Sequence, residues 1–289
     1  MIDLQIEEKV VLVTGANHGI GAATAKAFAA QGAKVFLTYF REPCVHTSAE
    51  LENAKGAGVS GVLLYRANQQ QTAESILKSI SSFGGTAAAK EIDLSDTRNI
   101  PLLFDYCENV LGPVDILVNN HTYCALDTFD PAKETAEGFG IHAITADDID
   151  VNCAVNTRSY ALMISEYTRR LLERKAEAGR IINLSTDAAH AHESNVSYAA
   201  SKHAIESYSR SAAIELGRYG ITVNIVAPGP IQTGYLTPEE EAHIAAGTPL
   251  HRIGKPEDVA DVIVFLASEK ARWLTGQLIY VGGGWRMHQ

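Results

Sequence analysis

Short apolar runs alternate along the chain with segments of helix length, in which the apolar residues are spaced more widely. Strands that alternate with helices in this way are typical of a parallel sheet covered by helices on both faces. The pattern therefore predicts an α/β fold with a doubly wound parallel sheet of about seven strands. The expected strands are Val10–Val13, Val35–Leu37, Thr86–Ile92, Ile116–Asn119, Arg180–Leu184, Thr222–Ala227 and Leu278–Val281.

No repeat, low-complexity tract or linker divides the 289 residues, so we expect a single domain over residues 1–289. Two stretches are longer than the connections that an α/β unit usually needs. The first is an insertion at about 42–66, which ends in a strand-like run, Val62–Tyr65, before a helix near Gln71. The second is a smaller insertion at about 131–144. It precedes a helix that begins with the capping-box sequence Thr145-Ala146-Asp147-Asp148.

Charge and composition exclude several classes of protein. Lys and Arg number 24 against 34 Asp and Glu, a net charge of −10, so general binding to nucleic-acid backbones is not expected. The aliphatic run Val262–Ala267 is far shorter than a membrane span, and the acidic N-terminus lacks the apolar core of a signal peptide. Four widely separated cysteines favour reduced thiols over a metal site. We therefore expect a cytoplasmic protein without a metal.

The first expected strand leads into a glycine-rich turn, Thr14-Gly15-Ala16-Asn17-His18-Gly19-Ile20-Gly21, which an alanine-rich helix follows. Gly15 permits a tight turn, Gly19 lets a ligand approach backbone N–H groups, and Gly21 lets the helix pack closely on the strand. Phosphate groups bind well at such a helix N-terminus. The turn therefore predicts a dinucleotide pyrophosphate site, although its spacing differs from Gly-x-Gly-x-x-Gly.

A second motif is Tyr198-Ala199-Ala200-Ser201-Lys202, which follows a strand that ends near Ser185-Thr186. On a helix, side chains four residues apart lie on one face. A nearby ammonium group favours the phenolate and lowers the pKa of a tyrosine towards the working pH. We expect Tyr198 to exchange a proton with a substrate oxygen, with Lys202 as the group that lowers its pKa.

Taken in order, these motifs resemble those of the short-chain dehydrogenase/reductase family, from Lys9 to about Gly284, with 3-oxoacyl-acyl-carrier-protein reductases as the nearest branch. The family's Asn-Asn-Ala-Gly motif corresponds to Asn119-Asn120-His121-Thr122, and its Pro-Gly segment to Pro228-Gly229. The resemblance implies a Rossmann-type domain and a nicotinamide cofactor. The implied cofactor contacts are Gly15, Asn17, His18, Gly19, Ile20, Gly21, Arg41, Asp93, Leu94, Asn119, Tyr198, Lys202, Pro228, Gly229, Ile231 and Thr233.

The resemblance also implies a catalytic set of Asn, Ser, Tyr and Lys. Tyr198 is then the general acid/base, Lys202 holds the nicotinamide ribose, and Asn152 matches the helix asparagine that anchors a relay water. Two residues compete for the hydroxyl that polarises the carbonyl. The family's spacing from the tyrosine selects Ser185, whereas alignment of the preceding strand selects Thr186. We favour Ser185 slightly and keep both.

His121-Thr122 replaces the family's Ala-Gly, which makes the floor of the cofactor pocket bulkier. The exchange indicates either a local change in packing or a changed substrate pocket, and packing is the interpretation that we favour. The family's C-terminal Val-Asp-Gly-Gly has become Val281-Gly282-Gly283-Gly284, so an acid near the usual subunit contact is lost.

Residues after the second strand predict the cofactor. NAD-selective relatives carry an acid at its end, where this chain has Tyr39-Phe40-Arg41. Arg41 can grip a 2′-phosphate, and His18 can add a donor, so we predict NADP, with NAD still possible. Tyr65-Arg66 repeats the Tyr-then-Arg pattern at the far end of the insertion, which makes Arg66 the alternative phosphate ligand.

We therefore expect hydride transfer between NADP(H) and a small-molecule carbonyl or secondary alcohol, in the manner of a 3-oxoacyl reductase. Sugar, polyol and xenobiotic carbonyls are alternative substrates, and a cofactor-sensing protein without turnover is the alternative function. The segment after Thr233, through Tyr235 and Leu236 to Glu241, is the expected lid. The resemblance further implies a homodimer or homotetramer that pairs along the helix Ala199–Leu216.

Overall fold

Seven parallel strands form one sheet in the computed structural model, which describes residues 3–135 and 140–286. Their order across the sheet is β3-β2-β1-β4-β5-β6-β7. All seven predicted strands are present, and the predicted doubly wound α/β fold is confirmed. The strands are β1 (Val10–Thr14), β2 (Lys34–Tyr39), β3 (Thr86–Glu91), β4 (Ile116–Asn119), β5 (Gly179–Leu184), β6 (Ile221–Pro228) and β7 (Leu278–Val281).

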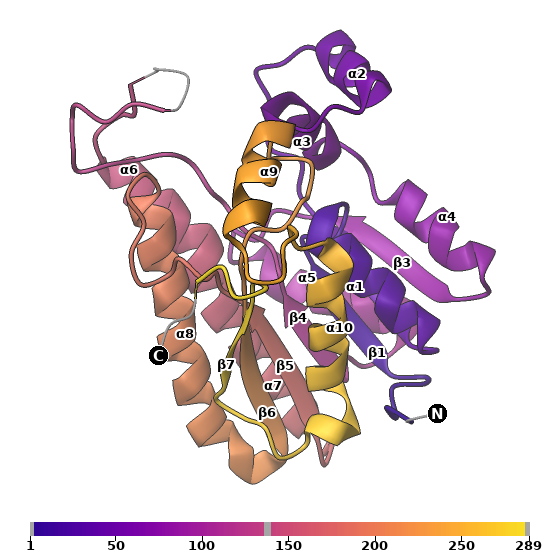
Figure 1. Ribbon diagram of the computed structural model, residues 1–289. Helices are drawn as coiled ribbons and strands as arrows, with labels where there is room; N and C mark the ends of the chain where they lie inside the picture. Colours follow the sequence, from indigo (N-terminus) through magenta and orange to yellow (C-terminus); the bar gives the residue numbers. More distant parts are fainter. Residues whose placement is uncertain (1–2, 136–139, 287–289) are drawn as a thin grey trace.

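Helices connect the strands and cover both faces of the sheet (Figure 1). They are α1 (Gly19–Ala30), α2 (Ser48–Ala57), α3 (Val62–Gln69), α4 (Glu74–Ser82), α5 (Asn99–Leu111), α6 (Ala146–Asn152), α7 (Ser159–Glu173), α8 (Val196–Leu216), α9 (Pro238–Gly247) and α10 (Pro256–Ala267). A π-helical turn, Cys153–Arg158, joins α6 to α7, and short 3-10 turns follow α8 and α10 at Gly217–Tyr219 and Glu269–Ala271. None of these helices is both long and apolar enough to cross a bilayer over the described ranges.

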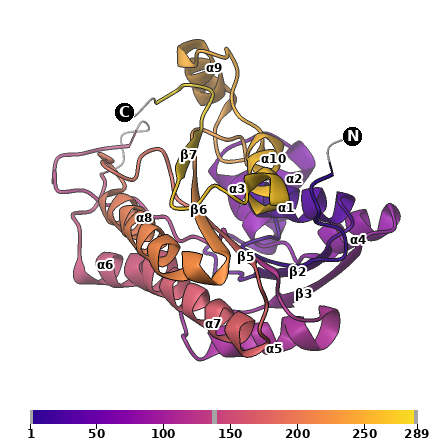
Figure 2. The same ribbon diagram turned by 90° about the horizontal axis from the view of Figure 1, so that it is seen from below.

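Successive side chains of a strand point to opposite faces of the sheet, so the inner strands contribute to two cores. Val11 and Val13 of β1 pack with α1, α4 and α10, whereas Leu12 packs with α5 and α7. Figure 2 shows the two helical layers on either side of the sheet. Burial on both faces explains why the strands read as continuous apolar runs in the sequence.

The chain reverses its direction across the sheet at β1. From β1 it proceeds outward to β2 and β3, then crosses back to β4 on the other side of β1. Helices leaving β1 and β4 therefore diverge, and a crevice opens at the carboxyl ends of these two strands. The glycine-rich turn and Asn119-Asn120 both lie at this point.

The first insertion forms helices α2 and α3. Val62–Tyr65, which looked strand-like, belongs to α3, so that expectation was wrong. A short apolar run does not distinguish strand from helix by periodicity. Here the hydrogen bonding is helical, because the Tyr65 N–H donates to the carbonyl of Gly61, four residues earlier, at 3.0 Å. In Figure 1, α2, α3 and α9 gather beyond one end of the sheet; because they follow β2 and β6, this is the carboxyl end.

The second predicted insertion, at about 131–144, includes residues 136–139, which lie outside the described residues. Thr128 and Ala143 form an isolated parallel bridge in this region. The helix expected at Thr145 is confirmed: the Thr145 hydroxyl accepts from the Asp148 N–H, and the Asp148 carboxylate accepts from the Thr145 N–H.

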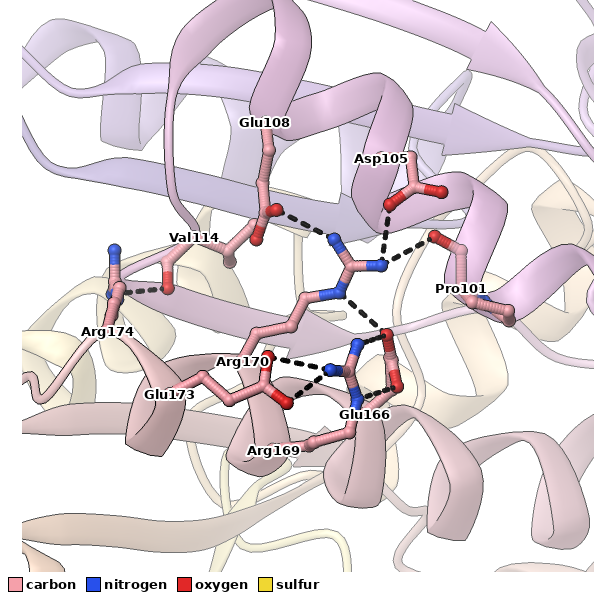
Figure 3. Close-up of polar contacts among 9 residues, drawn as sticks. All are labelled: Pro101, Asp105, Glu108, Val114, Glu166, Arg169, Arg170, Glu173 and Arg174. Carbon is pink, nitrogen blue, oxygen red and sulfur yellow. Dashed lines mark hydrogen bonds and ion pairs between the residues drawn. The ribbon is translucent and has the colours of Figure 1, made fainter.

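A charged cluster fastens α5 to α7 (Figure 3). The mostly buried Arg170 guanidinium contacts Glu108 and Asp105 of α5 at 2.7 Å each and Glu166 of its own helix at 2.6 Å. Arg169 is more exposed and pairs along α7 with Glu166 and Glu173. Arg170 is therefore the cluster member that joins two elements of the helical layer.

Candidate active site

Glycines bring the end of β1 and the start of α1 into close contact. Gly15 has a φ of +62°, and a Cβ on Gly21 would lie 2.2 Å from the Gly15 carbonyl oxygen. No side chain fits at Gly21, so the helix begins directly against the strand. No side chain caps the N-terminus of α1, and its first-turn N–H groups are left for a ligand. This cradle fits a pyrophosphate.

The cradle opens into a cavity of about 760 Å³. Its walls come from the glycine-rich turn, the end of β2, α3, the segment after β3 and the segment after β4. This size suits a dinucleotide or a comparable ligand. The predicted cofactor residues that line it are Gly15, Asn17, His18, Gly19, Ile20, Gly21, Asp93, Leu94 and Thr233.

Several predicted cofactor residues lie outside the lining of this cavity. Asn119 is fully buried in β4 and donates to the Asn183 side-chain oxygen of β5 at 2.9 Å. Its neighbour Asn120 lines the cavity instead, and donates to the carbonyls of Thr14 and Gly15. The other predicted cofactor residues that are absent from the lining are Arg41, Tyr198, Lys202, Pro228, Gly229 and Ile231. Asn120 is thus the member of the Asn-Asn pair that shapes the glycine-rich turn.

Tyr198 and Lys202 lie near the start of α8, beside the carboxyl end of β5. The Lys202 ammonium is buried, donates to the Leu184 carbonyl at 2.9 Å, and lies 5.9 Å from the centre of the Tyr198 ring. Burial lowers the pKa of Lys202 to about 7. Burial also raises the pKa of Tyr198 in the protein alone, the opposite of the direction expected from Lys202. The phenol is therefore protonated and able to donate.

The two candidate hydroxyls have different partners. Ser185 is buried and donates to the Glu206 carboxylate of α8 at 2.8 Å. Thr186 contacts Tyr198 and opposes the effect of burial on the pKa of that phenol, while its hydroxyl also donates to the Asp187 carboxylate at 3.5 Å. Thr186, rather than the slightly favoured Ser185, is therefore the hydroxyl beside Tyr198.

Asn152 and Asn156 lie one turn apart where α6 passes into the π-helical turn. Asn152 donates to the Asp148 carbonyl within its own helix at 2.9 Å. Asn156 donates to the Ser201 hydroxyl of α8 at 2.9 Å and accepts from the Tyr123 N–H at 2.8 Å. Asn156, which the sequence analysis missed, therefore links α8 to the cavity wall. Its spacing from Asn152 was the only available signal.

His121 occupies a buried position between the glycine-rich turn and the π-helical turn. Its Nδ1 is 2.7 Å from the Thr14 hydroxyl, and its Nε2 is 2.6 Å from the Ser159 hydroxyl, which itself donates to the Val155 carbonyl. Ser159 must then accept from Nε2–H, so Thr14 donates to Nδ1. Burial lowers the pKa of His121 to about 3. The imidazole is a neutral packing element, in line with the interpretation that we favoured, and it also borders the cavity.

The two arginines that competed as phosphate ligands have different surroundings. Arg41 makes a bidentate pair with Glu91 at the end of β3, with atoms 2.7–3.1 Å apart, and does not line the cavity. Arg66 does line it, together with Glu42. Burial raises the pKa of the Glu42 carboxyl, while Arg66 opposes this rise. Arg66 is therefore the better placed of the two.

An aromatic contact joins the insertion to the turn and to the expected lid. The Tyr65 ring of α3 lies 5.4 Å from both the His18 and the Tyr235 rings. Asn17 donates to the carbonyls of Gln69 and Gln71 at 2.9 Å each. Burial lowers the pKa of His18 to about 4, so it offers a neutral imidazole rather than a cation. The insertion thus covers the glycine-rich turn.

These residues fit a nicotinamide dinucleotide. The glycine cradle, the large cavity and a buried His18 Nδ1 without a hydrogen-bond partner all lie together. Within residues 3–135 and 140–286, no group of three or more His, Cys, Asp or Glu side chains is arranged to hold a metal ion.

Known proteins resemble this chain over nearly its whole length. A family model described as short chain dehydrogenase matches residues 9–64, and one described as Enoyl-(Acyl carrier protein) reductase matches residues 46–286.

Two curated relatives show similar identity. The uncharacterized oxidoreductase YjdA of Bacillus subtilis is 32% identical over 281 residues, covering 96% of this chain and 97% of the relative. Versicolorin reductase stcU of Emericella nidulans is 32% identical over 297 residues, covering 97% and 96%. A solved dehydrogenase/reductase structure from Sinorhizobium meliloti is 29% identical, with a TM-score of 0.76 and coverage of 99% and 98%.

Proposed function

The chain belongs to the short-chain dehydrogenase/reductase family of NAD(P)-dependent oxidoreductases, and from this premise we propose that it interconverts a carbonyl and a secondary alcohol with NADP(H). One observation carries the proposal: the Thr186 hydroxyl, the Tyr198 phenol and the Lys202 ammonium lie together, and Tyr198 and Lys202 both interact with Cys124 in the wall of a dinucleotide-sized cavity. When bound, the nicotinamide supplies or accepts the hydride.

The remaining chemistry belongs to this chain's side chains. Tyr198, protonated because of its burial, donates its phenolic proton to the carbonyl oxygen during reduction. Thr186 donates a second hydrogen bond to the same oxygen and stabilises its developing charge. Lys202 holds the ribose hydroxyls and favours the phenolate that remains. Asn152 was expected to anchor a relay water. We assign this role instead to Asn156, because Asn156 contacts Ser201 of α8.

We propose NADP as the preferred cofactor, with Arg66 as the ligand of its 2′-phosphate. Arg66 lines the cavity and carries a planar guanidinium, the geometry that phosphate binds bidentately. Glu42 lines the same cavity, and a carboxylate there would repel a 2′-phosphate. An ionised Glu42 would instead favour the ribose hydroxyls of NAD, so the two cofactors must be compared directly.

We infer a 3-oxoacyl thioester as the substrate, with a versicolorin-like compound as the alternative. The match to the model described as Enoyl-(Acyl carrier protein) reductase supports a substrate carried by acyl carrier protein, and the likeness to Versicolorin reductase stcU supports the alternative. The described parts of the substrate side carry Tyr123, Cys124 and Ala125, a mixed apolar wall.

We further propose an oligomer in a reducing compartment, such as the cytoplasm. Cys44, Cys107, Cys124 and Cys153 are free, as is usual where thiols are kept reduced. On α8, Ile214 is 84% exposed and Tyr208 51% exposed, and such apolar exposure favours a partner surface along this helix.

Oxidation of NADPH and NADH against a panel of 3-oxoacyl thioesters, cyclic ketones, sugars and simple carbonyls tests the function. We expect turnover in the wild type and a loss of about 10²–10⁴-fold in Tyr198→Phe, which keeps the ring but has no transferable proton. Cofactor affinity, measured by fluorescence titration, should persist in that variant. Binding without turnover of any carbonyl would support a sensor, and near wild-type turnover in Tyr198→Phe would refute the mechanism.

A further inference from the structure

A second buried tyrosine, Tyr160 near the start of α7, contacts Lys202. It is 1% exposed, and its hydroxyl lies 3.5 Å from the Lys202 Nζ. The same ammonium lies 5.2 Å from the centre of the Tyr160 ring. Nothing in the motifs that identify the family involves this residue, and the mechanism above does not use it.

A hydrogen bond to the His121 backbone fixes the orientation of the Tyr160 hydroxyl. It donates to the His121 carbonyl at 2.7 Å, so its lone pairs remain available to the ammonium. Burial raises the pKa of Tyr160 well above its ordinary value, which keeps the phenol in the donating form. The Tyr160 and His121 rings also pack together, with centres 4.6 Å apart.

His121 is itself fixed at both ring nitrogens. Thr14 of the glycine-rich turn and Ser159, next to Tyr160, hold its imidazole. The position of the Tyr160 oxygen is therefore determined by the glycine-rich turn on one side and by α7 on the other. A rigid acceptor of this kind is what orients a flexible lysine side chain.

An ammonium group has three N–H donors. Over residues 3–135 and 140–286, Lys202 has two hydrogen-bond acceptors, the Leu184 carbonyl and the Tyr160 hydroxyl. They come from β5 and α7, so together they fix the rotation of the group. One N–H remains for the ribose of a bound cofactor.

We propose that Tyr160 is a positioning residue for Lys202: its buried hydroxyl, anchored on His121, holds the ammonium so that one donor stays available to the cofactor. The inference rests on the proposed function for its consequence in catalysis, but its physical content is a contact within the protein. His121 and Thr14 act through Tyr160 as its supports.

The contact also affects the charge on Lys202. A hydroxyl oxygen that accepts from an ammonium favours the charged form, so its removal lowers the pKa of the lysine. The other titratable groups that face Lys202 are Tyr198 on α8, Cys124 after β4 and His121. These groups stay in place when Tyr160 becomes Phe, which keeps the ring and removes only the oxygen.

The test compares Tyr160→Phe with Tyr167→Phe. Tyr167 is also a fully buried phenol of α7, but it donates to the Asp115 carbonyl and accepts from the Arg180 N–H, away from the cavity. The titration of Lys202 is followed directly by ¹³C NMR of ε-labelled lysine, assigned with Lys202→Met. The affinity for NADPH is measured by fluorescence between pH 6 and 9.

In Tyr160→Phe we expect the Lys202 titration to move about one pH unit lower, and the Kd for NADPH at pH 8 to rise about tenfold. Tyr167→Phe should shift neither. Unchanged titration and Kd in Tyr160→Phe, or equal shifts in both variants, would overturn the proposal. If Tyr160→Phe does not fold, as judged by circular dichroism, Tyr160→Met fills the site without an oxygen and takes its place.

The NMR readout separates this proposal from the proposed function. A wild type that reduces no carbonyl, or binds no NADPH, would refute the function, while the shift of the Lys202 titration would still decide whether Tyr160 holds the ammonium.

Discussion

At the scale of single residues, neighbouring side chains of the same chemistry have different partners. Ser185 and Thr186 both carry a hydroxyl at the end of β5. Ser185 points to Glu206 of α8, whereas Thr186 contacts Tyr198. Because successive residues of an extended chain face opposite sides, the two hydroxyls cannot share one task.

Substitution separates these two hydroxyls. We expect Thr186→Ala to lower kcat/KM by about 10²–10³-fold, because one donor to the carbonyl oxygen is lost. Ser185→Ala should keep its activity within severalfold and lose about 1 kcal/mol of stability, since the Glu206 carboxylate loses a donor. Steady-state kinetics and urea unfolding measure the two effects. A larger loss of kcat/KM in Ser185→Ala than in Thr186→Ala would show that Ser185 donates the hydrogen bond to the carbonyl oxygen.

The buried His121 makes stability depend on pH. Its folded-state pKa of about 3 lies below the value of 6.5 for the unfolded chain. The unfolded state therefore binds the proton first as the pH falls, and stability is lost from about pH 6.5 downward. At pH 4.5 this histidine should contribute a loss of about 2–3 kcal/mol relative to pH 7.

We expect His121→Gln to be less stable than the wild type at pH 7, but to lose less stability on acidification. His18, whose pKa is also lowered, remains in both proteins and cancels in the comparison. Urea unfolding at pH 7 and pH 4.5 measures the difference between the two proteins. A difference that is the same at both pH values would contradict the neutral, buried imidazole.

At the scale of elements, the insertion changes which arginine faces the cavity. Helix α3 carries Arg66 to the cavity, while Arg41 at the end of β2 is held by Glu91. We expect Arg66→Ala to raise the Kd for NADPH by about tenfold or more and to change that for NADH little, since only NADPH carries the 2′-phosphate.

Arg41→Ala is the matched control for this measurement and should change both Kd values less than threefold. Isothermal titration of both cofactors on wild type and the two variants gives the comparison. Tighter binding of NADH than of NADPH by the wild type, insensitive to either substitution, would show that NADP is the wrong cofactor.

Arg170 fastens one helix to another, and its neighbour Arg169 does not. Arg170→Ala removes the mostly buried cation that Glu108 and Asp105 of α5 share, and we expect a loss of about 2–3 kcal/mol. Arg169→Ala removes two ion pairs along one helix, with Glu166 and Glu173, and should cost less than 1 kcal/mol. Urea unfolding compares the two, and equal losses would mean that the link between α5 and α7 stabilises nothing.

At the scale of the whole molecule, helix α8 contributes both to the site and to the surface. Its start carries Tyr198 and Lys202, while Ile214 near its end is almost fully exposed. A partner that covers this face would hold the helix on which the site is built. Assembly and site geometry would then be coupled through one rigid element.

We expect light scattering to give a mass of two or four times 31.1 kDa at micromolar concentration. Ile214→Glu places a charge on the exposed face of α8 and should shift the protein towards the monomer. Val110→Glu, on α5, is the control at another exposed aliphatic residue, 61% exposed against 84% for Ile214. A monomeric wild type would refute the oligomer. An unchanged mass in Ile214→Glu would show that the interface does not include this face of α8.

The sequence by itself determined the fold, its seven strands and the glycine-rich turn that borders the cavity. These depend on local signals. They are continuous apolar runs for strands buried on both faces, a glycine where helix and strand pack too closely for a side chain, and Tyr and Lys one helical turn apart. The sequence could not show that Val62–Tyr65 is helical, because a run of four apolar residues fits either a strand or a helix.

Only the tertiary structure decided which side chains meet. Tyr160 reaches Lys202 from a helix 42 residues earlier in the chain, and Arg66, rather than Arg41, arrives at the cavity by way of the insertion. Asn156 reaches Ser201 where Asn152 does not, because a π-helical turn changes the path of the helix between them. Contacts of this kind depend on how distant elements pack, and no spacing within one segment encodes them.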